Sequence, residues 1–404
     1  MKKVFLVVLT VLMVSLSFSV TTITISGWPG NPDEEAAIKA AVDEFNATHK
    51  DIQVDWEPIP GNYLETLKTR ISAGTAPDIF YVDVYFFEEL AGKNILLPLD
   101  LFIKKDNFNL NAYFEPLVNA FKYNERVYGI AKDFSTLAFF FNKEIFDKYG
   151  VPYPTSEDTW FDLLDKALQL KRKGFETPLV LAADFNRVIP FILGTGGSLV
   201  DENLNTALDT PASRFGIKFY VDMVTKYKVA VEPQEVGAGW IGEALGKEKV
   251  AMAMTGPWTI GFLKGSYPDV FKKIGVVEMP SLIRKVTMVY TVSWSINRNT
   301  PHKNEAWEVL KFLVTRGQEI FVERAGVLAS RKDIAAKDTD PIKVPFYKGA
   351  EYAYPWKVPT PTGIFSIAND QINSRLKDLF YGKITLDEAL KQIKDNYFDW
   401  VSGK

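Results

Sequence analysis

The chain of 404 residues contains no cysteine and only two histidines, His49 and His302. The absence of cysteine excludes disulfides, thiolate nucleophiles, iron–sulfur clusters and Cys-ligated zinc. Two histidines far apart in the sequence cannot form the usual multi-histidine metal site. The formal net charge of −3 offers no strongly basic surface for nucleic acid. We therefore expect no metal ion, no other cofactor and no nucleic-acid partner.

Sequence motifs for enzyme chemistry are scarce. The phosphate-binding pattern GxxxxGK[ST], the dinucleotide pattern GxGxxG and the nucleophile-elbow pattern GxSxG are absent. Residues 194–197 are glycine-rich, but no lysine follows them, which favours a turn after an apolar helix. The 50 acidic residues leave one enzymatic alternative open, a secreted glycoside-acting enzyme with a carboxylate pair. The irregular spacing of the predicted strands argues against an eight-unit barrel for such an enzyme.

The first 19 residues have the features of an export signal. Lys2 and Lys3 form a charged start, an apolar stretch follows at 4–18, and Ser19 precedes the expected cleavage. An N-terminal membrane anchor is the alternative, although the apolar stretch is short for a membrane span. No cysteine is present to carry a lipid. We therefore expect a secreted protein, periplasmic or extracellular, that is not a lipoprotein.

Beyond residue 19 the hydrophobic pattern alternates between predicted strands and helices. Thr21–Ser26 alternates β-branched residues, as a strand does, and 33–49 places apolar residues along one helix face. A β-α-β-α-β order continues to residue 84 and predicts an α/β lobe with a largely parallel sheet. A second lobe of the same class is predicted from about residue 127. Further strands are expected at 127–130, 137–141, 179–183, 250–255, 274–277 and 287–296, and further helices at 158–173, 212–227, 303–315, 317–325, 366–381 and 386–396.

Aromatic residues are abundant: 29 Phe, 17 Tyr and 9 Trp. A sugar ring has apolar C–H faces and a rim of hydroxyls, so a site for it combines flat aromatic rings with polar side chains. Such residues are expected in loops and at strand ends, where side chains are presented to ligands, although each can instead be a packing residue. The candidates are Trp28, Tyr63, Asp83, Tyr85, Trp240, Trp258, Trp294 and Trp356. Packing inside predicted strands or helices is expected for Trp56, Trp160, Trp307 and Trp400.

Five segments, taken in order, resemble a known protein family. They are RISAGTAPDIF at 70–80, YGI and FFNK within 128–143, TWFDLL at 159–164, AMAMTGPW at 251–258 and GKITLDEAL at 382–390. Together they resemble the extracellular solute-binding proteins of carbohydrate ABC importers, the family that includes maltose-binding protein. The segment AMAMTGPW is the most specific, because the family places a sugar-stacking tryptophan at the position of Trp258.

The resemblance implies a two-lobed periplasmic-binding-protein fold of type II. Each lobe is expected to have a mostly parallel sheet flanked by helices, with three crossings between the lobes. The expected N-terminal lobe comprises 20–131 and 296–335, and the expected C-terminal lobe comprises 132–295 and 336–404. The crossings are expected near 130–134, 293–297 and 328–340.

The resemblance also implies ligand-binding roles for Asp83, Asp133 and Trp258, and less directly for Asp184 and Asn186. The implied function is capture of a sugar, expected to be an oligosaccharide, between two closing lobes. The sugar would then pass to the membrane permease of an ABC transporter. The protein is expected to act as a monomer and without catalysis.

Two departures from the family pattern leave the sugar open. Ser135 and Thr136 stand where an acidic residue is often found, and 290–292 replaces a common glycine pair. A binding protein for a metal ion or an amino acid is an alternative, although the two histidines argue against metal. An adhesive or sensory sugar-binding module is another alternative, and it would differ only in its partner.

Overall fold

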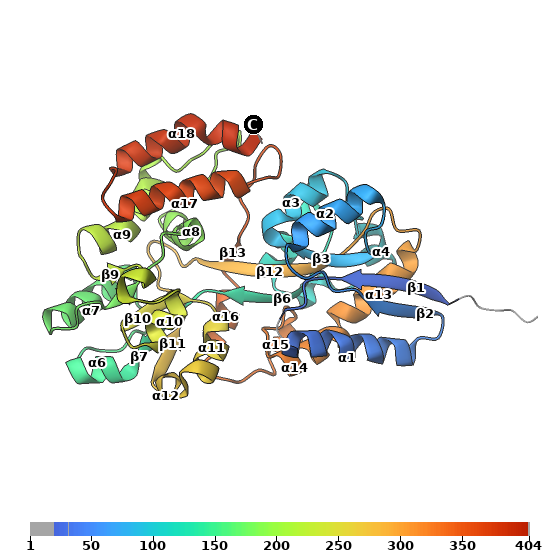
Figure 1. Ribbon diagram of the computed structural model, residues 1–404, viewed down its shortest axis with the longest axis horizontal. Coiled ribbons are helices and arrows are strands. Elements are labelled where there is room, and N and C mark those ends of the chain that lie inside the picture. The colour runs from blue at the N-terminus through green and yellow to red at the C-terminus, as the bar shows by residue number, and fades with distance from the viewer. Residues whose placement is uncertain (1–19, 31, 403–404) are drawn as a thin grey trace, which may run out of the picture.

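The computed structural model describes residues 20–30 and 32–402, and the predicted export signal at 1–19 lies outside these residues. The described chain forms two lobes, each built on its own sheet and flanked by helices (Figure 1). The two-lobed α/β architecture predicted from the sequence is therefore confirmed.

The first sheet is built from β1 (Thr21–Ser26), β2 (Ile52–Trp56), β3 (Ile79–Asp83), β6 (Ile130–Thr136), β12 (Thr287–Ile296) and β13 (Ala353–Pro355). Their order is β13-β12-β3-β1-β2, and β6 also pairs with β12. β1 is parallel to β2 and β3, as the β-α-β-α-β order predicts. β12 runs antiparallel to β3 and to β6.

The second sheet is built from β7 (Ala138–Asn142), β8 (Leu179–Val180), β9 (Ala230–Val231), β10 (Met252–Thr255) and β11 (Ile274–Val277), in the order β11-β7-β10-β8-β9. The β10–β8 and β8–β9 pairs are parallel, whereas β7 is antiparallel to both of its neighbours. This sheet is evenly mixed, although the sequence predicts a mostly parallel one. β7 enters directly from β6, without the crossover helix that makes neighbouring strands parallel.

Helices lie on both sides of the first sheet (Figure 1). They are α1 (Pro32–Thr48), α2 (Tyr63–Ala73), α3 (Val84–Gly92), α4 (Asp100–Lys105), α5 (Glu115–Ala120), α13 (Lys303–Val314) and α14 (Arg316–Ala325). The helices of the second lobe are α6 (Lys143–Tyr149), α7 (Trp160–Arg172), α8 (Phe185–Gly194), α9 (Pro211–Thr225), α10 (Ile241–Gly246), α11 (Trp258–Ser266), α12 (Pro268–Phe271), α17 (Ser366–Phe380) and α18 (Leu386–Ser402). Two short helices, α15 (Lys332–Ala335) and α16 (Val344–Gly349), lie between the lobes (Figure 1).

Local sequence explains several element ends. The Asn62 side chain accepts a hydrogen bond from the Glu65 backbone N–H at the start of α2, and Gly74 ends that helix in the left-handed conformation. Thr159 and Asp162 form a capping box at the start of α7. The single strand expected at 127–130 is wrong, because Tyr128 and Gly129 belong to no strand and separate two different strands. β5 (Arg126–Val127) closes a short hairpin with β4 (Lys122–Tyr123), and β6 begins separately.

The strands β6 and β12 run through the region between the lobes (Figure 1). They pair with each other, and β6 leads into β7 with only Leu137 between them. The predicted lobe boundaries at 131/132 and 295/296 fall inside these two strands. The lobes therefore share a continuous two-stranded ribbon, which we call the hinge ribbon.

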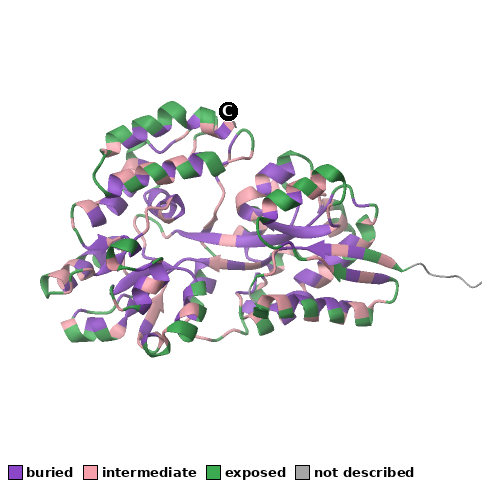
Figure 2. Ribbon diagram, viewed as in Figure 1, coloured by how far each residue is buried: buried purple, intermediate pink, exposed green. Residues whose placement is uncertain are grey.

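Buried residues follow the strands and the inner faces of the helices (Figure 2). Phe80 in β3 and Phe140 in β7 are fully buried, so each lobe has apolar packing on its own sheet. Within 20–30 and 32–402, no helix is both long and apolar enough to span a membrane.

Candidate functional site

A cavity of about 570 Å³ opens between the two lobes. Its lining includes Glu34 of α1, Asp133 of β6, Trp258 of α11, Gly326 after α14 and Lys343 before α16. Residues from both lobes and from the hinge ribbon therefore meet there. We refer to this cavity and the side chains around it as the interlobe site.

A β-bulge in the hinge ribbon decides which side chains face the interlobe site. The register pairs Ser135 with Tyr290 and Asp133 with Val292, and then skips Lys132. An extra residue of this kind shifts the alternation of side chains along the strand. Because directly paired residues share a face of the sheet, Asp133 and Tyr290 lie on the same face of the ribbon.

Asp83 belongs to the same face. Val292 pairs with Asp133 on one side and with Asp83, the last residue of β3, on the other. Asp83 also caps α3, since its Oδ1 accepts a hydrogen bond of 2.8 Å from the Tyr85 backbone N–H. Burial raises the pKa of Asp83 to about 6; the hydrogen bond from Tyr85 acts to lower this pKa, and the carboxylate of Asp133 acts to raise it.

One buried cation accompanies these carboxylates. The Lys132 side chain is 5% exposed and pairs with Asp133. Its Nζ lies over the Tyr81 ring, 4.9 Å from the centroid, and over the Phe321 ring at 4.3 Å. Burial raises the pKa of Glu34, which the positive charge of Lys132 partly offsets. This side of the site is therefore rich in hydrogen-bond acceptors that are partly withdrawn from water.

The C-terminal lobe contributes the start of α8. Asp184 caps this helix, and its Oδ1 accepts a hydrogen bond of 2.6 Å from Asn186 Nδ2. The Asn186 Oδ1 accepts a hydrogen bond of 2.6 Å from the Tyr290 hydroxyl. Asn186 is buried, so its contacts position Tyr290 and Asp184. Asp184 and Asn186 are among the ligand-binding residues predicted from the sequence. Tyr290 is not, because in the sequence it stands out only as part of a departure from the family pattern.

A run of aromatic rings crosses from one lobe to the other. The Tyr85 and Trp356 ring centroids lie 4.5 Å apart, those of Trp356 and Tyr290 5.6 Å apart, and those of Tyr290 and Trp258 5.7 Å apart. Trp258 is 40% exposed, an unusual fraction for so large an apolar side chain. Its ring folds back over Gly256, where a Cβ atom would lie only 2.1 Å from the ring. The GPW sequence thus permits the conformation of this tryptophan.

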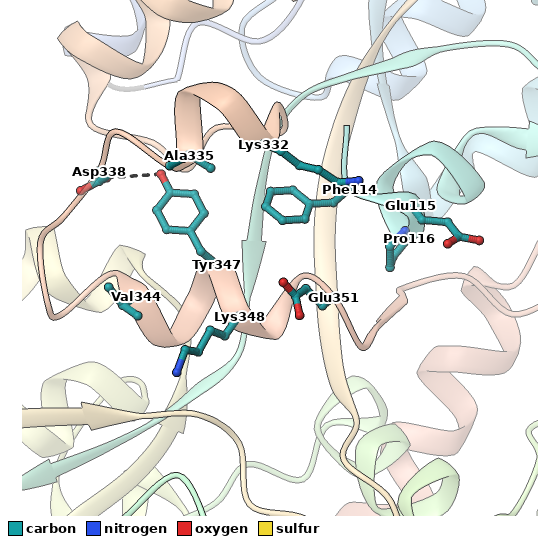
Figure 3. A pocket seen from close by; sticks show the side chains of 11 residues that line it. Phe114, Glu115, Pro116, Lys332, Ala335, Asp338, Val344, Tyr347, Lys348 and Glu351 are labelled. Atoms are coloured by element: carbon teal, nitrogen blue, oxygen red, sulfur yellow. Dashed lines mark hydrogen bonds between the residues drawn. The ribbon is translucent and has the colours of Figure 1, made fainter. Parts of the chain in front are cut away.

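A second cavity, of about 560 Å³, lies between the start of α5 and the short helices α15 and α16. Figure 3 shows Phe114, which precedes α5, and Tyr347 of α16 facing it, and both rings contact Phe134 of β6. Phe134 also lines the interlobe cavity, so this strand residue lies beside both cavities. The Tyr347 hydroxyl donates a hydrogen bond of 3.3 Å to Asp338, which also pairs with Lys343. No candidate residue from the sequence lines this cavity.

Two candidates are wrong, because both are core residues. Trp294 is 2% exposed, and its ring packs against Tyr81 at 4.4 Å and Trp56 at 6.4 Å. Tyr63 is 7% exposed, and its hydroxyl donates to the Tyr81 backbone carbonyl at 2.9 Å. Neither ring is accessible to a ligand.

Two further candidate tryptophans pack against other aromatic rings and do not line the interlobe cavity. Trp240 packs edge-on against Phe262, and it is the Phe262 ring that lines the cavity. Trp28 packs edge-on against Tyr63 and Tyr81. Both remain partly accessible, so a direct role in binding stays a prediction for them.

The family profile described as bacterial extracellular solute-binding protein matches residues 29–320. The chain belongs to this family. It is similar to the maltotriose-binding protein of Pyrococcus abyssi, with 23% identity over 92% of this chain and 81% of that one. It is also similar to the multiple sugar-binding protein of Streptococcus mutans, with 22% identity over 80% and 78%.

Solved structures support the same assignment. An ABC substrate-binding protein of Listeria monocytogenes, in complex with cycloalternan, matches with a TM-score of 0.78 and 25% identity over 94% of this chain and 98% of that one. The sugar-binding protein MalE of Xanthomonas citri matches with a TM-score of 0.84 and 19% identity over 95% and 98%. The type II two-lobed fold expected from the sequence is thereby confirmed. As an extracellular solute-binding protein, the chain is a binding protein and not an enzyme.

Proposed function

We propose that this protein captures an oligosaccharide in the interlobe site and delivers it unaltered to the membrane permease of an ABC transporter. The observation that carries the proposal is the aromatic run of Tyr85, Trp356, Tyr290 and Trp258. Aromatic faces stack on the apolar faces of sugar rings, and carboxylates such as Asp83 accept hydrogen bonds from the hydroxyls. Four aromatic rings offer more stacking surface than one sugar ring covers, which supports an oligosaccharide.

The relatives support the same ligand class. The Pyrococcus and Streptococcus proteins are named for maltotriose and for multiple sugars, and the Listeria structure contains a cyclic oligosaccharide. These ligands differ, so the family supports a sugar without selecting one.

Closure of the lobes follows from where the aromatic rings lie. Tyr85 stands on α3 of the first lobe, whereas Trp258 stands on α11 of the second. A sugar that touches both stabilises the closed form over the open form, because only the closed form makes both sets of contacts. The hinge ribbon is the element about which the lobes would rotate.

Three measurements test the proposal: thermal unfolding, titration calorimetry and mass spectrometry. Purified protein is screened by thermal unfolding against glucose, maltotriose, cellotriose, α-1,5-arabinotriose and β-1,4-galactotriose. A bound trisaccharide at 100 times its Kd should stabilise the protein by about 2.7 kcal/mol. Titration calorimetry then gives the Kd, and mass spectrometry shows whether the sugar is recovered intact. If none of these sugars binds, the proposal is contradicted. If the sugar is recovered cleaved, the result supports the alternative of a glycoside-acting enzyme.

We further propose that residues 1–19 direct export and that the protein acts as a monomer. The charged and apolar parts of 1–19 support the first point. Export from a bacterial host and N-terminal sequencing test it, with Val20 expected as the first residue. Light scattering coupled to size-exclusion chromatography tests the second, and a mass near twice that of one chain would contradict it.

A further inference from the structure

Arg187, on the first turn of α8, lies beside the aromatic run although no sequence motif singles it out. Its guanidinium carbon is 5.7 Å from the Trp258 ring centroid and 5.9 Å from the Tyr290 ring centroid. A cation at this distance over two aromatic faces is held in place by cation–π attraction. Arg187 therefore lies next to Trp258, the member of the aromatic run that lines the interlobe cavity.

The hydrogen-bonding capacity of Arg187 is not used within the described chain. Its Nη1 is shielded from solvent and has no hydrogen-bond partner among residues 20–30 and 32–402. Arg187 also forms no ion pair with any acidic residue among 20–30 and 32–402. A guanidinium carries five N–H donors and no acceptor. A shielded donor without a partner is unfavourable, so an oxygen atom supplied by a ligand would relieve this state.

The charges around Arg187 favour a neutral ligand. Asp184 caps α8 just before Arg187, and the charges of both residues affect the pKa of Tyr290. Burial raises the pKa of Tyr290 to about 12, Arg187 acts to lower it, and Asp184 acts to raise it. Across the site, Asp83 and Asp133 flank Val292. These carboxylates would repel a sugar that carries its own carboxylate, whereas hydroxyls can donate to them and accept from Arg187.

We propose that Arg187 is a ligand-contacting residue that donates hydrogen bonds to oxygen atoms of a neutral sugar ring seated against Trp258 and Tyr290. In this role it selects the sugar that the C-terminal lobe accepts. The carboxylates of the interlobe site accept from sugar hydroxyls, and Arg187 supplies the complementary donors. This inference rests on the proposed function, since it names the residue and the ligand class of the same site.

Two substitutions of Arg187 and one matched control test the inference. Arg187→Met keeps an unbranched chain but removes the donors and the charge, whereas Arg187→Lys keeps the charge but loses the planar set of donors. Arg375 provides the control, because its guanidinium carbon lies 5.4 Å from the Trp400 ring centroid and its Nε is likewise shielded without a partner. Arg375 stands on α17 and packs on α18, outside the interlobe cavity.

Calorimetric titrations use maltotriose, cellotriose, α-1,5-arabinotriose, β-1,4-galactotriose and trigalacturonate as probes. For each neutral trisaccharide that binds the unmodified protein, Arg187→Met should weaken binding by about 10- to 100-fold. Arg187→Lys should weaken it less, and Arg375→Met should leave it unchanged. Equal affinity of Arg187→Met and the unmodified protein would overturn the inference. Tighter binding of trigalacturonate than of every neutral sugar would overturn the neutral ligand class while leaving sugar capture intact.

A second measurement separates direct contact from support of the Trp258 ring. Monodeoxy analogues of the bound trisaccharide are titrated into both proteins. If Arg187 donates to one hydroxyl oxygen, the analogue that lacks this hydroxyl binds the unmodified protein weakly and loses nothing further in Arg187→Met. If Arg187 only supports the ring, Arg187→Met weakens all analogues by the same factor, and the inference is refuted. If no neutral trisaccharide binds the unmodified protein but trigalacturonate does, the inference fails while sugar capture stands; if none of the sugars binds, the proposed function fails as well.

Discussion

Replacement of Trp258 by alanine removes the most accessible ring of the aromatic run. The side chain is 40% exposed, so much of its ring is free to contact a ligand. The other part packs against Tyr290 and beside Arg187. Alanine keeps the backbone N–H and C=O and has a high helix propensity, so the substitution leaves the backbone hydrogen bonds of α11 in place. We therefore expect weaker sugar binding with little change in folding.

The expected loss follows from the exposed area. A tryptophan can bury up to about 250 Å², so its exposed 40% corresponds to about 100 Å². At about 25 cal/mol per Å², covering all of this area contributes about 2.5 kcal/mol, and covering half contributes about 1.2 kcal/mol. These energies correspond to increases in Kd of about 60-fold and about 8-fold.

Titration calorimetry with the trisaccharide identified by the thermal screen measures this loss. Phe161→Ala is a matched control, because Phe161 lies on α7, is 53% exposed and packs only edge-on against Phe219. The control should bind as tightly as the unmodified protein. Circular dichroism should show both variants folded at 25 °C. Unchanged affinity in folded Trp258→Ala would refute the stacking role of this ring.

Three other predictions concern pH, the core and the contact between lobes. Because burial holds the pKa of Asp83 near 6, its carboxylate becomes protonated below that pH and then accepts weaker hydrogen bonds. Sugar affinity measured by calorimetry should therefore fall about 3- to 10-fold from pH 7 to pH 5. Asp83→Asn should abolish that fall in affinity. It should also raise the unfolding temperature at pH 7 but not at pH 4, since the buried charge is unfavourable only above the unfolded-state pKa. A difference in unfolding temperature between the two proteins that is the same at both pH values would contradict this. Trp294→Ala should lower the free energy of unfolding in urea by about 3–5 kcal/mol, because the ring is 2% exposed; a loss below about 1 kcal/mol would show that it is not core. Lys357→Met should weaken sugar binding about fivefold, because Lys357, on the segment that leads from β13 to α17 of the second lobe, pairs at 3.5 Å with Glu88 of α3 in the first lobe; an unchanged Kd would show that this pair does not hold the lobes together.

The sequence predicts a helix or strand well where its hydrophobic residues follow one clear periodicity, either that of a helix or that of a strand. Alternating β-branched residues mark β1, and an apolar face marks α1, with ends that agree within one or two residues. Pro77 stands between α2, which ends at Ala73, and β3, which begins at Ile79, where a proline favours the end of a helix. The mixed order of the second sheet could not be predicted, because the pairing of β7 depends on its entry from the hinge ribbon and not on its own residues.

The interlobe site is predicted only in part, because burial along a strand is a tertiary property. Tyr290 and Trp294 stand four residues apart on β12 and share a face by alternation, yet Tyr290 borders the site while Trp294 lies under Tyr81. The bulge that skips Lys132, and so places Asp133, appears only in the pairing with β12. Arg187 has no local signal either, since its role depends on Trp258, which is 71 positions away in the sequence but beside it in space.

The most direct measurement is a crystal structure of the protein with the trisaccharide that binds it most tightly. Two cavities of nearly equal volume, about 570 and 560 Å³, are candidates to hold it: the interlobe cavity, and the cavity between α5, α15 and α16. We predict that the sugar lies in the interlobe cavity beside Asp133, stacked on Trp258 and in contact with residues of both lobes. A sugar bound in the second cavity beside Phe114 and Tyr347, or on one lobe alone, would contradict the account.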